Sequence, residues 1–562
     1  MVLYADKPWL KSYKVGAFKL KTTIDYPKKP LFSILDETAE KFPGKDAYYY
    51  LGNRMKYRKL KQQVDSLANA LMNLGIKKRD KVVVFLPTCP QFMISDFAVL
   101  KTGAVLVPSS PLLKAPELIR QARESGAETI ICLDMYLDLV NSVKDKSGLK
   151  NIIVTSAGDY SPAESEEIKE IKGTYSLRKL ISDHEPKAPE VEITPMEDLA
   201  VLAFTGGSTG IPKGVMITHF QRLASILQGL PWMMAPLLAY RGRASLLLPI
   251  PIFHAYGHYL MQSSIYWGLK VFLVPDPRDT EMIAQLMNEY RPFLICMVPT
   301  QILNLAQSGI EIKRMPVMIV SAAAPLPTEI AIKIEEKIKM PISEGYGLTE
   351  CISHINISAF SKVTRFATST TPGIGIPVPD TEVKLVDPET EKEVPFGDVG
   401  ELWLRGPQVM KGYWPEPGSG LEEDGWLRTG DLCKMDENGY FTVVDRIKDM
   451  INISGMKVYS IEIDDLLFKH PAVAGAVTIG IPDPKRPGSE RIKAFVRLKD
   501  DYKGKIESQE IIDYCRERLA AYAVPKYIEF RDNLPLTVTE KLFKRALREE
   551  EIQKMKENIL GG

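Results

Sequence analysis

The sequence predicts an α/β protein with a large N-terminal domain of layered α/β subdomains, a β-rich subdomain and a small α+β C-terminal domain. Three observations support this prediction. The length of 562 residues is too great for a domain with a single hydrophobic core, so two or more domains are expected. Short apolar runs alternate with amphipathic stretches through the first part of the chain. The pattern then changes twice, near Gly373 and near Lys448.

The first part of the chain has the alternation of strands and helices that is typical of a parallel sheet. In chain order we expect a strand at 81–86, a helix at 91–102, a strand at 105–108, a helix at 115–125, and strands at 128–132 and 151–155. Helical crossovers between strands favour parallel pairing. Residues 156–190 are polar and acidic, which predicts a surface linker and helix ahead of a strand at 199–204.

The second part of the chain predicts two smaller units. Strands at 382–386 and 400–405, within a turn-rich stretch from 373 to 414, indicate a β-rich subdomain. The clearest boundary lies near Lys448. Beyond it we expect a strand, a helix at 461–469, strands at 474–481 and 491–498, and a helix at 508–519. About a hundred residues in this order make a sensible independent unit, so we expect domains at 1–447 and 448–562.

Composition excludes several classes of protein. The net charge of +1 gives no support for nucleic acid or an anionic membrane as a bulk partner. The six cysteines form no CxxC pair, which fits a reducing cytosol. The N-terminus lacks the apolar core of a signal peptide, and prolines break the longest apolar run, 244–252. We therefore expect a cytoplasmic protein without an integral membrane segment, and the sequence leaves a homodimer open beside a monomer.

The segment from Phe204 to Gly214 is the most informative part of the chain. It places four glycines, three hydroxyl side chains and one lysine within eleven residues, Phe-Thr-Gly-Gly-Ser-Thr-Gly-Ile-Pro-Lys-Gly. Open backbone N–H groups, hydroxyl donors and one cation suit a polyphosphate. The spacing is not that of a Walker A loop, because Lys213 is followed by Gly214. The alternative is a flexible turn between a strand and a helix.

This loop resembles the phosphate loop of the adenylate-forming superfamily, which includes acyl-CoA synthetases, luciferases and peptide-synthetase adenylation domains. Four further segments resemble the family's motifs and follow in its order: 346–350, 429–431, 445–449 with 454–457, and 535–541. The similarity is greatest to the medium- and long-chain fatty acyl-CoA synthetases. It implies an N-terminal AMP-binding domain, a C-terminal domain that is mobile about a hinge near Lys448, and ATP, Mg²⁺ and CoA as ligands.

The resemblance implies roles for residues at the phosphate end of the nucleotide. Lys213, with Thr205, Ser208 and Thr209, would hold the β- and γ-phosphates, although Gly206 stands where the family commonly has a hydroxyl. Glu350 would be the Mg²⁺ ligand, since carboxylate oxygens suit this hard cation. Thr349 would donate to the α-phosphate.

It also implies the groups that surround the nucleoside and the reacting thiol. Tyr346 would face adenine, Asp431 would accept the ribose hydroxyls with Arg446 beside it, and Gly455 would let the pantetheine arm pass. The remaining expected nucleotide-site residues are Ala323, Glu344 and Gly345. A tight turn is the alternative for segment 346–350, and a routine turn for 429–431.

Lys541 is the expected catalytic residue of the first half-reaction. One ammonium group there can contact both the acyl carboxylate and the α-phosphate and offset their repulsion. Glu540 precedes it where the family usually has glycine, which either holds the lysine back or orients it. The alternative is a charged, solvated loop.

The acid substrate is predicted from the segment 251–258, Pro-Ile-Phe-His-Ala-Tyr-Gly-His. It matches the aromatic-histidine motif of fatty and aryl acyl-CoA synthetases, and His254 is the expected functional histidine. No aspartate typical of amino-acid-activating relatives is present. Candidates for the tunnel wall are Trp232, Met233, Met234, Tyr256, Met297, Val298 and Cys351, and none of them is a charged group that would recognise a dicarboxylate or an amine. Glu344 to Cys351 most resembles the long-chain members.

These features predict an ATP-dependent acyl-CoA synthetase that acts on medium- or long-chain fatty acids through acyl-AMP. An aryl-acid CoA ligase of the coumarate or benzoate kind is one alternative. A fatty acyl-AMP ligase that serves a carrier protein is another. The third is a catalytically silent ligand-binding relative, against which Lys213, Glu350, Asp431 and Lys541 argue because such a protein needs none of them.

Overall fold

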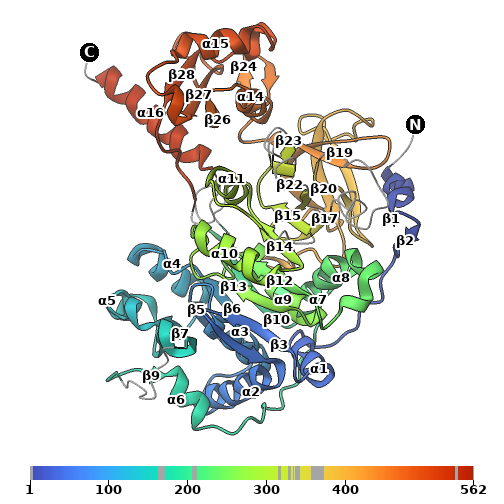
Figure 1. Ribbon diagram of the computed structural model, residues 1–562, viewed down its shortest axis with the longest axis vertical. Helices are drawn as coiled ribbons and strands as arrows, with labels where there is room; N and C mark the ends of the chain where they lie inside the picture. Colours follow the sequence, from blue (N-terminus) through green and yellow to red (C-terminus); the bar gives the residue numbers. More distant parts are fainter. Residues whose placement is uncertain are drawn as a thin grey trace.

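The structure is a computed structural model, and it describes residues 4–162, 171–205, 212–313, 318–326, 331–332, 334–335, 342–355, 373–537 and 542–560. Two large sheets with helices on their faces make up the N-terminal part, and a β-rich unit follows them. A separate C-terminal domain lies at one end of the molecule, next to α11 (Pro299–Gln307) (Figure 1). The predicted fold class is therefore confirmed.

The first large sheet has eight strands and is mostly parallel, with an antiparallel edge where the chain returns after the glycine-rich segment. Its order is β21 (Gly412–Tyr413), β11 (Lys213–Thr218), β10 (Leu199–Thr205), β6 (Val105–Ser109), β5 (Lys81–Phe85), β7 (Thr129–Leu133), β8 (Asn151–Thr155) and β9 (Tyr175–Ser176). The five strands predicted for this region are all present within a residue or two. β9 was not predicted, because it is a two-residue edge strand inside a polar stretch.

The second large sheet has nine strands and continues into the β-rich part of the chain. Its order is β18 (Ile376–Pro377), β17 (Ile352–Ile355), β16 (Ile342–Gly347), β15 (Met318–Ala322), β14 (Leu294–Met297), β12 (Ser245–Leu248), β13 (Lys270–Leu273), β3 (Asp46–Tyr50) and β4 (Asn53–Lys56). β12 to β16 pair in parallel, so their carboxyl ends share one edge.

Side chains that alternate along the strands divide the interior into layers. Val82 and Val84 of β5 face the core between the two sheets, whereas Val83 and Phe85 face an outer core on the other side. The helices follow this division and are α1 (Ser33–Lys41), α2 (Tyr57–Asn73), α3 (Pro90–Lys101), α4 (Ala115–Ser125), α5 (Leu137–Ser147), α6 (Leu177–Ser182), α7 (His219–Gln228), α8 (Leu230–Met233), α9 (Ala255–Trp267), α10 (Thr280–Tyr290) and α11. α2, α3, α7 and α9 contribute to the inner core.

The β-rich unit is a four-stranded antiparallel sheet, as predicted. Its order is β19 (Glu382–Val386), β20 (Gly400–Arg405), β22 (Leu427–Met435) and β23 (Phe441–Arg446). The first two strands have the predicted bounds. The sheet extends further than the sequence pattern indicated, since β22 and β23 carry the 429–431 and 445–449 motifs.

The C-terminal domain has the predicted strand and helix order, with a hairpin in place of the first strand and two further elements. It contains the hairpin β24 (Ile451–Ile453) and β25 (Met456–Val458), helix α14 (Ser460–Phe468), the strands β26 (Val473–Pro482), β27 (Glu490–Leu498) and β28 (Tyr527–Phe530), and the helices α15 (Ser508–Arg516) and α16 (Lys544–Leu560). The predicted helix at 508–519 ends three residues early. β28 and α16 were not predicted.

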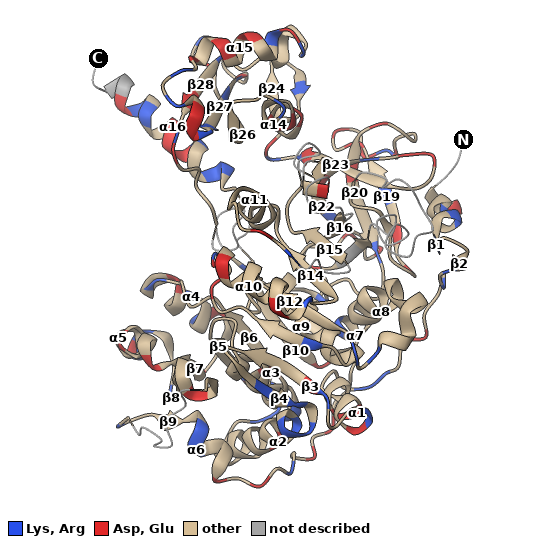
Figure 2. Cartoon of the chain, in the orientation of Figure 1, with Lys and Arg blue, Asp and Glu red and all other residues tan. Residues whose placement is uncertain are grey.

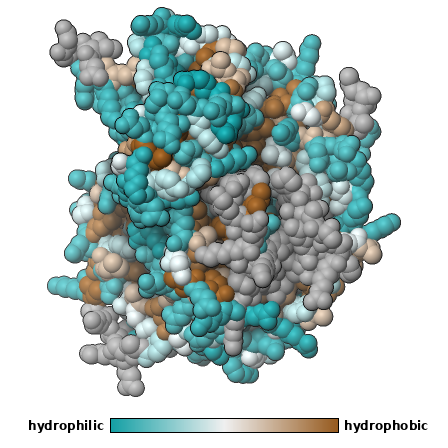
Figure 3. Space-filling view, turned by 45° about the horizontal axis from the view of Figure 1, so that its top comes forward, coloured by the Kyte–Doolittle hydropathy of each residue, from teal (hydrophilic) through white to brown (hydrophobic). Residues whose placement is uncertain are grey.

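The surface carries both signs of charge and few large apolar groups. Figure 2 shows Lys and Arg interspersed with Asp and Glu, as the net charge of +1 leads one to expect. On the face shown in Figure 3, hydrophobic residues occur in small groups among hydrophilic ones. Within the described residues, no helix is long and apolar enough to cross a bilayer. All six cysteines are buried and free.

The packing of α1, α2 and α3 depends on one buried cation. The Lys101 side chain is 2% exposed, and its Nζ lies 2.5 Å from Asp36 Oδ1 and 2.6 Å from Asp65 Oδ1. Replacing Lys101 with Met removes the buried partner of Asp65 and leaves this carboxylate only the half-exposed Lys61, whose Nζ lies 2.5 Å from Asp65 Oδ2. The free energy of unfolding should therefore fall by about 2–3 kcal/mol. Urea unfolding of the full chain, followed by circular dichroism, measures this change.

Lys150→Met is the matched control, because Lys150 pairs with Glu128 on the surface and both side chains are well exposed. An exposed pair contributes about 0–1 kcal/mol. Equal effects of the two substitutions would contradict the role given to Lys101.

Candidate functional site

Most described residues of the motif segments lie around one cleft, whereas the segment 454–457 lies apart from it. The cleft has a volume of about 1460 Å³ and runs between the N-terminal part and the C-terminal domain. Its lining includes Thr205, Lys213, His254, Ala323, Glu344, Gly345, Tyr346, Thr349, Glu350, Asp431, Arg446 and Lys448. Residues separated by more than two hundred positions in the sequence therefore share one site.

Asp431 joins three of these segments. Its side chain is almost fully buried; Oδ2 accepts a hydrogen bond from the Tyr346 hydroxyl at 2.5 Å, and Oδ1 accepts one from Arg446 Nε at 2.6 Å. The carboxylate raises the pKa of the Arg446 guanidinium, and burial together with this carboxylate raises the pKa of Tyr346. Each donor stays protonated, so the three side chains form a fixed, charge-assisted network.

The local backbone explains why Asp431 points into the cleft. Gly430 has a φ of +70°, a left-handed conformation that suits glycine, and its N–H donates to Glu401 Oε1 at 3.1 Å. Asp431 N–H donates to Thr429 Oγ1 at 3.1 Å. In the β22–β23 ladder Asp431 lies opposite Arg446, which places the two side chains on one face of the sheet.

Tyr413 links the candidate phosphate lysine to the candidate metal ligand. Lys213 Nζ lies 4.8 Å from the centre of the Tyr413 ring, and the Tyr413 hydroxyl donates to Glu350 Oε1 at 2.7 Å. Thr205 is the register partner of Lys213 across β10 and β11. Tyr413 lies on the edge strand β21, and its distance in the sequence from both partners gave no signal of this role.

Glu350 fits a magnesium site in which the protein supplies few of the ligands. One of its two oxygens faces Tyr413, which leaves further acceptor positions on the carboxylate. Across the described part of the chain, no group of three or more His, Cys, Asp or Glu side chains is arranged so that it could hold a metal ion. A single carboxylate is the usual protein share of a Mg²⁺ that is bound mainly by phosphate oxygens and water.

The wall of the cleft at the carboxyl ends of β15 and β16 contains Ala323, Glu344 and Gly345. Ala323 has a φ of +75°, an unusual conformation for a residue with a Cβ. Glu344 lies beside Ser321 in the ladder, and backbone N–H groups of Leu326 and Gly373 donate to it. Burial outweighs these donors and raises the pKa of Glu344 to about 7.

His254 forms the N-cap of α9, where its Nδ1 accepts from Tyr256 N–H at 3.4 Å. Thr349 follows β16 and lines the same cleft. Gly455 lies apart from the cleft lining, in the turn of the β24–β25 hairpin, with a φ of +92° and open space around its Cα.

Ser208, Thr209 and Lys541, with Gly206 and Glu540, lie outside the described residues. Thr205 and Pro212, which flank the first gap, and Thr537 and Leu542, which flank the second, line the cleft.

The expected tunnel-wall residues lie only partly on the cleft. Met233, Tyr256 and Cys351 line the cleft as expected, but so does Arg222, a residue that the sequence analysis did not single out. Trp232, Met234, Met297 and Val298 pack in the hydrophobic cores instead. Arg222 was missed because a single arginine in a helical pattern usually lies on the solvent face.

Comparisons with known proteins agree with this site. The family model "AMP-binding enzyme" matches residues 35–414, and the model of its C-terminal domain matches 462–541. The chain is 34% identical to the long-chain-fatty-acid–CoA ligase of Bacillus subtilis, over 98% of this chain and 99% of that protein. It is 32% identical to the enzyme of the same name from Escherichia coli O6:H1, over 97% and 98%.

Solved structures show the same architecture. ATP-bound MatB from Rhodopseudomonas palustris superposes with a TM-score of 0.81 at 25% identity, covering 93% of this chain and 98% of that one. The anthranilate CoA ligase AuaEII, in complex with anthranoyl-AMP, superposes with a TM-score of 0.80 at 26% identity, covering 96% and 98%. The fold and the motifs thus define an adenylate-forming enzyme. The chain belongs to the AMP-binding enzyme family.

The raised pKa of Glu344 predicts a pH-dependent stability. The folded state binds this proton more tightly than the unfolded state, whose carboxyl group has a pKa near 4.5. Ionised Glu344 therefore destabilises the fold as the pH rises from about 4.5 to about 7. Glu344→Gln should stabilise the protein by about 1–3 kcal/mol above this window and leave it unchanged below.

Thermal unfolding of the wild type and of Glu344→Gln across the pH range tests this. The expected result is a gap between the two melting temperatures that opens as the pH rises. Parallel curves would show that Glu344 titrates normally.

Proposed function

We propose that this chain is a cytoplasmic, ATP-dependent ligase that joins a fatty acid to CoA through an acyl-AMP intermediate. The network of Tyr346, Asp431 and Arg446 is the observation that carries the proposal, because it assembles a nucleoside site from three separate motifs. The names of the relatives from Bacillus subtilis and Escherichia coli support a medium- or long-chain fatty acid as substrate. The proposed function involves neither nucleic acid nor an integral membrane segment.

In the first half-reaction the fatty acid carboxylate attacks the α-phosphate of ATP, and acyl-AMP forms as pyrophosphate leaves. Asp431 accepts the ribose hydroxyls through lone pairs that Tyr346 and Arg446 leave free. Tyr346 also offers its ring to adenine, beside Ala323, Glu344 and Gly345. His254 and Thr349 position the carboxylate and the α-phosphate.

The phosphate end of the site supplies the positive charge that this step needs. Lys213 and Thr205, with Ser208 and Thr209, hold the β- and γ-phosphates and guide pyrophosphate out. Mg²⁺ at Glu350 neutralises charge on the phosphate oxygens when it is bound. Lys541 contacts the carboxylate and the α-phosphate together, and the flanking Thr537 and Leu542 line the cleft from the C-terminal domain.

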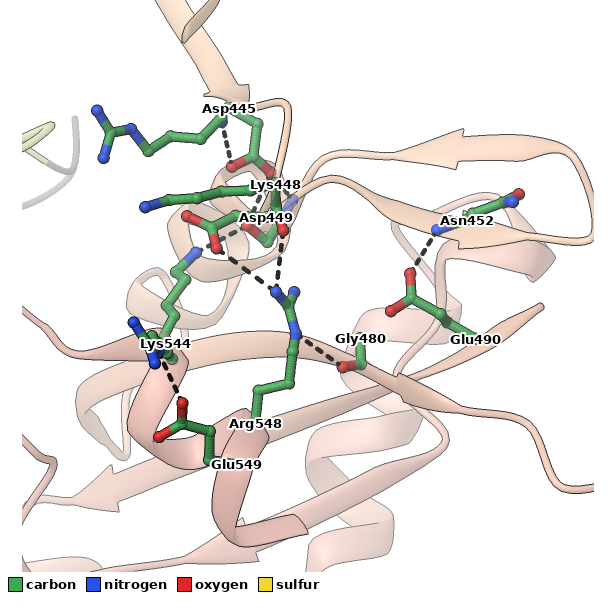
Figure 4. Close-up of polar contacts among 12 residues, drawn as sticks. Asp445, Lys448, Asp449, Asn452, Gly480, Glu490, Lys544, Arg548 and Glu549 are labelled. Atoms are coloured by element: carbon green, nitrogen blue, oxygen red, sulfur yellow. Dashed lines mark hydrogen bonds and ion pairs between the residues drawn. The ribbon is translucent and has the colours of Figure 1, made fainter. Parts of the chain in front are cut away.

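In the second half-reaction the CoA thiol attacks the acyl carbon and AMP leaves. We place the pivot of the C-terminal domain between Arg446 and Lys448, in support of domains at 1–447 and 448–562. Arg446 is bound to Asp431 of the N-terminal part. Arg548 of α16 binds the other side: its Nη1 donates to the Lys448 carbonyl at 2.9 Å, and its Nε donates to the Gly480 carbonyl at 3.3 Å (Figure 4).

Among the contacts that cross this pivot, a buried one at Asp445 must open when the domain turns. Asp445 Oδ2 accepts from Ser460 Oγ at 2.7 Å, and Lys544 Nζ donates to the same hydroxyl at 2.7 Å. Rotation would withdraw Lys541 and bring the Gly455 turn toward the acyl-AMP. Gly455 is suited to this role because nothing lies within 4 Å of the position a Cβ would take.

The test is CoA-dependent AMP release with ATP, Mg²⁺ and a panel of acids: acetate, straight chains from short to long, benzoate and coumarate. A maximum among the straight chains supports the proposal. An aromatic preference would favour an aryl-acid CoA ligase. Pyrophosphate release without thioester formation would indicate a carrier protein as acceptor, and size-exclusion chromatography of the same sample distinguishes a homodimer from a monomer.

A larger side chain in place of Gly455 should slow only the second half-reaction. We expect Gly455→Leu to lower the rate of thioester formation by roughly ten- to a hundredfold, because a misplaced thiol loses its attack geometry. Pyrophosphate release in the absence of CoA should be unchanged. Gly504→Leu is the control, since Gly504 also has a positive φ and open space around it but lies elsewhere in the domain. Equal thioester rates for the two variants would remove Gly455 from the thiol path.

A further inference from the structure

Arg222 is a buried cation on the wall of the cleft. It lies on α7, is 4% exposed and lines the cleft with Met233, Tyr259 and Leu260. Its Nη2 donates to His258 Nδ1 at 3.1 Å. Its Nε has no hydrogen-bond partner among the described residues, and no carboxylate among them forms a direct ion pair with it. A guanidinium in this position is incompletely satisfied.

The countercharge of Arg222 is Asp96, which acts through His258. Burial lowers the pKa of His258, so the imidazole is neutral, accepts from Arg222 at Nδ1 and carries its proton on Nε2. His258 Nε2 lies 3.2 Å from Asp96 Oδ2, and Gln262 Nε2 donates to the same oxygen at 2.9 Å. The four side chains form a buried cluster whose net charge is zero.

The position of this cluster relates it to the acyl chain rather than to the nucleotide. His258 follows His254 by four residues, so it lies one turn, roughly 5.4 Å, further along α9. His254 is the residue placed beside the reacting carboxylate. Arg222 lines the cleft together with apolar side chains such as Met233 and Leu260, so under the proposed function it would face the substrate chain beyond its carboxyl group.

A plain hydrocarbon chain does not satisfy this site. An unpaired buried donor costs about 1–3 kcal/mol, and an alkyl group offers no acceptor. A second carboxylate would satisfy Arg222 but would add an uncompensated negative charge to a cluster that Asp96 has already balanced. An uncharged oxygen meets both conditions, because it accepts a guanidinium N–H of Arg222, which lines the cleft, and leaves the net charge at zero.

We propose that Arg222 binds an uncharged acceptor oxygen, a hydroxyl or oxo group, on the chain of the acid substrate. This inference rests on the proposed function and narrows its substrate class from plain fatty acids to acids that carry such an oxygen. Arg222 is then a specificity-determining residue, and the cluster of Asp96, His258 and Gln262 positions it.

The test compares matched acids of equal length: the plain straight-chain acid, its hydroxy and oxo derivatives, and the dicarboxylic acid. CoA-dependent AMP release gives kcat/KM for each on the wild type, Arg222→Met and Arg222→Met/Asp96→Asn. The double variant removes both buried charges, so it remains informative if the single variant folds poorly. We expect the wild type to favour a hydroxy or oxo acid by about tenfold or more. Both variants should lose or reverse this preference.

The ratio of rates separates recognition from a purely structural role. A structural role lowers all rates together and leaves the ratio unchanged, which would overturn the proposal. A wild-type preference for the plain acid at every length, or for the dicarboxylic acid, would also overturn it. Absence of AMP release with any acid would instead overturn the proposed function, and this inference with it.

Discussion

The Asp431 carboxylate is the interaction on which the site depends. Its two oxygens bind a hydroxyl from β16 in the second large sheet and a guanidinium from β23 in the β-rich sheet. At 3% exposure it is shielded from solvent, so these bonds are stronger than they would be at the surface. One buried charge thus joins two sheets and holds the residue that immediately precedes the proposed pivot.

The same arrangement would allow a rigid site to adjoin the C-terminal domain that we propose to move. Arg446 is held on the N-terminal side by Asp431, and Lys448 is held on the C-terminal side by Arg548. Between them only one residue, Ile447, links the two sets of contacts. Its own N–H donates to the Gly430 carbonyl, which assigns it to the N-terminal side. A change of backbone dihedrals over this short segment would turn the C-terminal domain without disturbing the nucleoside site.

The sequence was sufficient where local patterns carry the information. The predicted bounds are correct for one helix, 115–125, and for three strands, 151–155, 382–386 and 400–405. Each of these elements is flanked by residues that terminate it. The motif segments predicted that Tyr346, Asp431 and Arg446 would share a site, and they do. β28 and α16 were missed because Tyr527–Phe530 is half exposed and α16 is charged on most faces. Tyr413 and Arg222 were missed because their partners are distant in the sequence, and only tertiary contacts identify them.

The most direct test of this account is the affinity of the protein for ATP before and after Asp431→Asn. The substitution keeps the shape of the side chain and removes its charge, so the folded state should be retained. Isothermal titration should show affinity reduced by roughly ten- to a hundredfold, the equivalent of about 1.5–3 kcal/mol for hydrogen bonds to a charged group. Unchanged affinity in a folded variant would contradict the claim that this carboxylate organises the nucleotide site.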